Sequence, residues 1–124
     1  MTAQEIAEAI AERVRREGDA TFVMLAQDMP EHFQSGAMEI GLLDRNIVYW
    51  QNASPEALEA IEIFRRMPGM SLEPTQPLCY LIDGGVLSLP FARSIRAYDK
   101  PHWLPMLFTS RTSSATSQPP APRD

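Results

Sequence analysis

Proline is distributed unevenly along this chain and limits what each half can form. Nine of the 11 prolines lie after residue 67. A proline inside a helix removes a backbone hydrogen bond and clashes with the preceding turn, and in a sheet it is confined to edges and bulges. We therefore predict helices in the first half of the chain, and short strands with an extended arm in the second.

The N-terminal segment has the pattern of a capped amphipathic helix. Thr2 and Glu5 have the spacing of a capping box, in which the hydroxyl and the carboxylate each bind a backbone N–H at the helix start. An apolar stripe follows at i, i+4 spacing and consists of Ile6, Ile10 and Val14. The pattern predicts a helix over residues 3–17 that ends at Gly18.

Two shorter helices are expected next. Asp19 or Thr21 can cap the first of them, and Pro30 prevents it from continuing. Asp28 can cap a further turn or two of helix through Gln34, because proline is favoured in the first turn.

One clear strand follows these helices. Residues 47–50 are β-branched and aromatic, and polar residues stand on both sides of them. Residues 38–43 fit either a helix or a strand that pairs with 47–50 as a hairpin, so both alternatives stay open.

Residues 54–66 carry the most clearly marked helix. Ser54 stands at the N-cap position and Pro55 follows it in the first turn, as helix starts favour. Apolar side chains recur at helical spacing and should point inward. A row of carboxylates is left on the outer face, formed by Glu56, Glu59 and Glu62.

Residues 76–92 have the pattern of a β-hairpin. Asp83-Gly84-Gly85 offers a turn with positive φ between two apolar runs, residues 78–82 and 86–89. We therefore predict two strands joined by this turn.

The C-terminal part divides into an apolar arm and a polar tail. Residues 101–108 are apolar with two prolines, which predicts an extended arm or an edge strand. Residues 109–124 are rich in Ser, Thr and Pro and contain no aliphatic side chain larger than alanine, which predicts a disordered tail. We expect residues 1–108 to form a single domain, the usual outcome at this length.

Composition restricts the location of the protein. The single cysteine cannot form an internal disulfide, and no segment approaches the roughly 18 uninterrupted apolar residues of a membrane span. The N-terminus has no signal-peptide pattern. We expect a cytoplasmic protein with no membrane segment.

Catalytic and metal-binding patterns are weak. Cys79, Asp99 and His102 are the residue types of a thiol nucleophile, an orienting acid and a base, but Cys79 lies in a predicted apolar strand, where a free cysteine usually packs as a small hydrophobe. His32 and His102 do not stand at a recognised metal-ligand spacing. The sequence therefore predicts no enzyme activity, catalytic residue, metal site or cofactor.

The order of the predicted elements resembles that of the winged helix-turn-helix superfamily. There, the helix before the hairpin is the recognition helix and the hairpin is the wing. The resemblance covers residues 3–92 and rests on element order. It implies a small α+β domain with N-terminal helices, a recognition helix at 54–66, a wing whose tip is residues 83–85, and a C-terminal extended arm. We accordingly expect a DNA-associated regulator that acts as a homodimer.

The formal net charge of −5 is split along the chain. Residues 1–75 hold 13 acids and 6 bases, a net −7, whereas residues 76–124 hold 3 acids and 5 bases, a net +2. Because phosphate binding needs basic side chains, we expect contacts with double-stranded DNA after the hairpin and at the far end of helix 54–66. The candidates are Arg65, Arg66, Arg93, Arg96, Lys100 and His102. The alternative is ordinary solvated surface.

A protein-interaction or assembly module is the competing hypothesis. Glu56, Glu59 and Glu62 would repel phosphates and are candidate contacts for a protein partner. Trp103 is a further candidate, since large aromatic side chains anchor many interfaces. Its arm is expected either to be exchanged between two protomers or to be strapped across its own domain.

Overall fold

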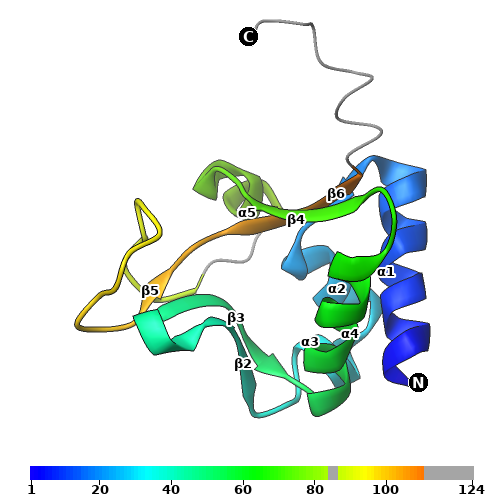
Figure 1. Ribbon diagram of the computed structural model, residues 1–124, viewed down its shortest axis with the longest axis horizontal. Coiled ribbons are helices and arrows are strands. Elements are labelled where there is room, and N and C mark those ends of the chain that lie inside the picture. Colours follow the sequence, from blue (N-terminus) through cyan, green and yellow to red (C-terminus); the bar gives the residue numbers. More distant parts are fainter. Residues whose placement is uncertain (84–86, 111–124) are drawn as a thin grey trace, which may run out of the picture.

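The computed structural model describes residues 1–83 and 87–110, and these form a mixed α+β fold (Figure 1). Two three-stranded sheets have the strand orders β1-β6-β4 and β2-β3-β5. The helices are α1 (Ala3–Glu17), α2 (Phe22–Asp28), α3 (Pro30–Phe33), α4 (Pro55–Arg66) and α5 (Pro77–Asp83). The strands are β1 (Asp19–Ala20), β2 (Met38–Leu42), β3 (Ile47–Ala53), β4 (Met70–Pro74), β5 (His102–Trp103) and β6 (Met106–Ser110), and a 3-10 turn, η1 (Leu43–Arg45), joins β2 to β3.

The two amphipathic helices form where local signals predict them. The hydroxyl of Thr2 accepts from the backbone N–H of Glu5, whose carboxylate accepts from the N–H of Thr2, so the capping box of α1 is complete. Gly18 ends α1 with a φ of 96°. Ser54 caps α4 by accepting from the N–H of Ala57 at 3.0 Å. Both predictions are confirmed.

Of the two short helices, α2 has an expected cap and α3 does not. Thr21 caps α2, but Asp28 does not cap α3. Asp28 is the last residue of α2, and its carboxylate lies 2.6 Å from the guanidinium of Arg13, which neutralises it. α3 begins after Met29 without a side-chain cap and is only one turn long.

Residues 38–42 form a strand, which decides between the two alternatives left open by the sequence. β2 pairs antiparallel with β3, and the pairing shifts register on either side of Ile40. At Gly41 the two strands lie so close that no side chain fits, because a Cβ atom there would lie 2.2 Å from the carbonyl oxygen of Ile47. Asn46 closes the turn in the left-handed conformation.

The predicted hairpin over residues 76–92 is wrong. Its first run is helix α5, and residues 87–90 are not a strand. A short apolar run does not distinguish a buried strand from a buried helix, and Pro77 suits a first helical turn. Asp83 ends α5, whereas Gly84 and Gly85 of the predicted turn lie outside the described residues. The wing that the resemblance placed here is therefore not formed by the described residues.

The predicted arm is extended, but it is not at an edge throughout. β5 pairs in parallel with β3 at the edge of its sheet, whereas β6 lies between β1 and β4. Pro105 precedes β6, so the strand itself keeps its N–H donors for both neighbours. Thr109 and Ser110 belong to β6, so the predicted tail begins two residues too early. The rest of that tail, residues 111–124, lies outside the described residues.

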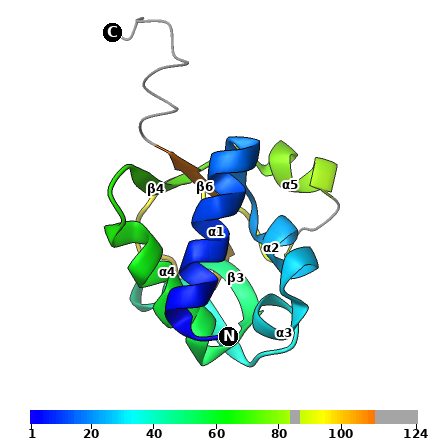
Figure 2. The same ribbon diagram turned by 90° about the vertical axis from the view of Figure 1, so that its right-hand side faces the viewer.

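An aromatic core connects the helices and both sheets. Phe22 of α2 stacks on Trp50 of β3 and packs edge-on against Phe108 of β6, with ring centroids 5.7 and 4.8 Å apart. Tyr80 packs edge-on against Trp103 at 5.2 Å. α1 and α4 lie side by side on the outside of this core (Figure 2). The side of α4 that faces away from the core therefore forms part of the molecular surface.

Candidate functional site

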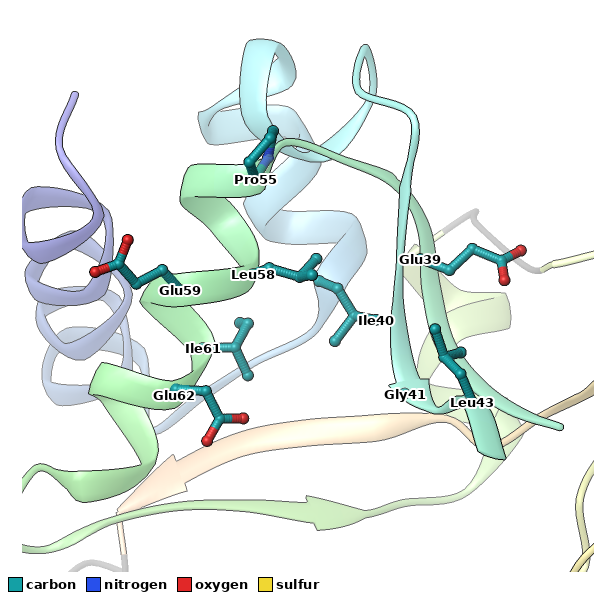
Figure 3. A pocket seen from close by; sticks show the side chains of 9 residues that line it. All are labelled: Glu39, Ile40, Gly41, Leu43, Pro55, Leu58, Glu59, Ile61 and Glu62. Atoms are coloured by element: carbon teal, nitrogen blue, oxygen red, sulfur yellow. The ribbon is translucent and has the colours of Figure 1, made fainter. Parts of the chain in front are cut away.

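A groove opens between α4 and β2 (Figure 3) and has a volume of about 450 Å³. We call it the α4/β2 groove. The residues that line it come from these two elements and the turn after β2: Glu39, Ile40, Gly41, Leu43, Pro55, Leu58, Glu59, Ile61 and Glu62.

The groove combines an apolar floor with acidic sides. In Figure 3 the side chains of Leu58, Ile61 and Ile40 converge, while the carboxylates of Glu59 and Glu39 diverge to opposite sides. Leu43 is 48% exposed and extends the apolar surface. Glu62, also exposed, carries the third carboxylate. An apolar strip with acidic sides can accept apolar side chains that are accompanied by positive charge.

The helical repeat of α4 produces this arrangement. Leu58 and Ile61 are three residues apart and share a face, and Glu59 and Glu62 follow each of them by one residue on the adjoining face. Across the groove, the irregular register of β2 surrounds Ile40, and bulges of this kind re-aim a side chain. Ile40 and Leu43 were not among the candidates from the sequence, because residues 38–43 had no settled structure.

The structure also gathers basic side chains at one end of the molecule. The loop over residues 93–100 lies against the η1 turn at the left of Figure 1. The N–H of Tyr98 donates to the carbonyl of Arg45 at 3.0 Å, and the side-chain amide of Asn46 donates to the carbonyl of Tyr98 at 2.8 Å. We call this cluster the basic end, and it consists of Arg45, Arg93, Arg96, Lys100 and His102. Two exposed acids, Asp44 and Asp99, lie in the same segments and reduce its net positive charge. Arg45 was missed, since only the tertiary fold brings it here.

Tyr98 organises the side chains of the basic end. The guanidinium of Arg96 lies 4.2 Å from the centre of the Tyr98 ring, and the ring of His102 stacks at 4.0 Å. Burial raises the pKa of Tyr98, but hydrogen bonds with Ser94 and the charge of Arg96 outweigh it, so the pKa lies below its ordinary value. His102 Nδ1 lies 2.7 Å from the carbonyl of Lys100 and donates to it, which leaves Nε2 for other partners.

The remaining predicted site residues lie on α4, apart from the basic end, and at Trp103, which follows His102 in β5. Arg65 and Arg66 are exposed at the end of α4, and the guanidinium of Arg65 lies 3.5 Å from the carboxylate of Glu62. Glu56 is exposed on α4 but does not line the groove. Trp103 is fully buried in its own chain, so the arm is strapped across its own domain and the ring offers no exposed contact.

Two pairs of reactive residue types have structural roles. The imidazole of His32 lies 2.7 Å from the hydroxyl of Ser54, a buried pair, but that hydroxyl also caps α4. Cys79 lies on α5, not in a strand, and its sulfur contacts the hydroxyl of Thr75 at 3.4 Å. Within the described ranges, no three His, Cys, Asp or Glu side chains are grouped closely enough to hold a metal ion.

Comparisons with models of protein families, with curated proteins and with solved structures match nothing. Among the described residues, none of the helices combines the length and the apolar character that a membrane crossing needs. The α4/β2 groove and the basic end are therefore the two surfaces that bear on function.

Proposed function

We propose that this protein is a protein-interaction module whose α4/β2 groove binds an apolar segment that carries positive charge. The observation that supports the proposal is the apolar floor of Ile40, Leu58 and Ile61 beside the carboxylates of Glu59 and Glu62. Ile40 and Ile61 are only 6% and 2% exposed, so the apolar surface that a partner can reach comes mainly from Leu58 and Leu43. Exposed apolar surface beside charge is typical of interaction sites. Charge complementarity then selects the partner and speeds the encounter.

The same carboxylates disfavour DNA contact through α4. A phosphate surface binds by exchanging counterions for basic side chains, and Glu59 and Glu62 would repel it. Helix 54–66 is therefore better suited to a basic protein segment than to a DNA groove.

Charge reversal in the groove is the direct test. We expect a synthetic peptide of alternating leucine and arginine to shift the backbone amide NMR signals of Ile40, Leu58 and Ile61. Glu59→Lys combined with Glu62→Lys should weaken this binding at least about tenfold, because each reversal replaces an attraction by a repulsion of similar size. The measurement is a ¹⁵N-¹H titration of the full chain.

Glu8→Lys with Glu12→Lys is the matched control for this titration. Both residues are exposed on α1, and the pair changes the net charge by the same amount. Binding by the control and not by the groove variant supports the proposal. Equal binding by all three proteins, or signal shifts away from the groove, contradicts it.

Association with double-stranded DNA is the second candidate function, and the basic end supports it. The turn between β2 and β3 adds Arg45 to the basic side chains of the loop over residues 93–100. A regulator of this type would use the basic end on the phosphate backbone.

A mobility-shift titration tests this second function. At about 50 mM salt, micromolar protein should retard random duplex DNA, since non-specific binders have dissociation constants of about 10⁻⁴–10⁻⁶ M. Arg93→Glu, Arg96→Glu and Lys100→Glu together should abolish the shift, whereas Arg65→Glu with Arg66→Glu should preserve most of it. No retardation by the unmodified protein contradicts DNA association.

A further inference from the structure

We propose that residues 91–96 of a second copy occupy the α4/β2 groove, so that the protein assembles head to tail. The inference depends on the proposed function of the groove and identifies its partner. Each copy carries both halves of the contact, on two different surfaces.

The segment has the composition that the groove requires. Phe91 and Ile95 are large apolar side chains that are 45% and 53% exposed. Arg93 and Arg96 stand between and beside them, and both are exposed. The apolar side chains match the accessible Leu58 and Leu43 of the groove. The two guanidinium groups match Glu59 and Glu62, and the contact with Glu62 would compete with Arg65, which lies 3.5 Å from it on the same helix.

The segment is held in place at both of its ends. The N–H of Ala92 donates to the carbonyl of Trp103 at 2.8 Å, and the N–H of Tyr98 donates to that of Arg45 at 3.0 Å. The ring of Phe91 also packs on that of Trp103, at 5.4 Å between centroids. These anchors hold the loop against the η1 turn. A loop that is already ordered loses little conformational entropy when it binds.

The contact is heterologous, because a loop on one copy meets a groove on the next. Contacts of this kind produce rings where the rotation closes and open chains where it does not. Each added copy leaves one unused loop and one unused groove until a ring closes. The assembly should therefore grow with concentration and weaken with salt.

Two charge-reversed variants provide the test, by sedimentation velocity of the full chain at low salt. Arg93→Glu with Arg96→Glu reverses the charge of the loop and leaves the groove unchanged. Glu59→Lys with Glu62→Lys reverses the charge of the groove and leaves the loop unchanged. We expect each variant alone to sediment as one chain, and an equimolar mixture to sediment as complexes of two chains or more. The control Glu8→Lys with Glu12→Lys should assemble like the unmodified protein.

The results separate this inference from the proposed function. If the unmodified protein sediments as one chain but the leucine-arginine peptide still binds its groove, the groove serves another protein and self-assembly is wrong. If neither occurs, both proposals are wrong. A mixture that fails to recover assembly also overturns the inference, as does an oligomer that survives both reversals. Circular dichroism identifies any unfolded variant, for which the corresponding glutamine substitutions then serve.

Discussion

Replacing Trp103 by alanine should lower the free energy of unfolding by about 3–5 kcal/mol, the usual cost of truncating a fully buried large aromatic side chain. The Trp103 ring is fully buried and packs edge-on against Tyr80, while its backbone pairs β5 with β3. Truncation removes the indole through which β5 packs on Tyr80 of α5 and leaves a cavity between α5 and the β2-β3-β5 sheet. Urea unfolding followed by far-ultraviolet circular dichroism measures the loss.

Trp103→Phe is the matched control. The indole N–H of Trp103 is buried and has no hydrogen-bond partner in the described part of the chain. Its removal therefore leaves no acceptor unpaired, and phenylalanine keeps part of the ring packing, so the control should retain much of the stability. A Trp103→Ala protein as stable as the unmodified one would show that the ring lies outside the core.

Tyr80→Phe should cost about 1–3 kcal/mol for each buried group that loses its partner. The Tyr80 hydroxyl accepts from the N–H of Phe22 at the start of α2 and donates to the carbonyl of Met106 at the start of β6. Both partners are buried, so no water replaces the hydroxyl. The same urea experiment measures the effect, with hydrogen exchange at the amide of Phe22 as a local readout.

Tyr98→Phe is the control for this substitution. It removes a hydroxyl that bonds to the backbone of Ser94 at the exposed surface, where water can take its place. We expect a much smaller loss of stability. Equal losses for the two tyrosines would contradict the bridging role of Tyr80.

The parts of the fold that the sequence predicts correctly are those with local signals. The capping box at Thr2 and the Ser54 cap involve residues only three positions apart, so their helices need no tertiary information. Residues 78–82 offer no such signal. Whether they form a strand or a helix depends on where Tyr80 finds partners, and these lie 58 and 26 residues away.

In the candidate surfaces, too, the parts with local sequence signals were predictable and those that depend on tertiary contacts were not. Glu59 and Glu62 were predictable, because a helical repeat fixes which side chains share a face. The opposite wall of the groove, at Ile40, depended on the pairing of β2 with β3. Trp103 shows a different limit, since residue type alone does not separate a buried anchor from an interface anchor.

Because β6 lies between β1 and β4, the first sheet can close only after the ribosome has added nearly all of the described chain. Asp19 pairs with Thr109, and Phe108 packs edge-on against both Phe22 and Phe64. Such distant pairings slow folding, since a long loop must close before they form. Until Phe108 is made, a nascent chain lacks the ring that packs edge-on against these two core phenylalanines. Incompletely packed apolar surface of this kind favours aggregation during folding.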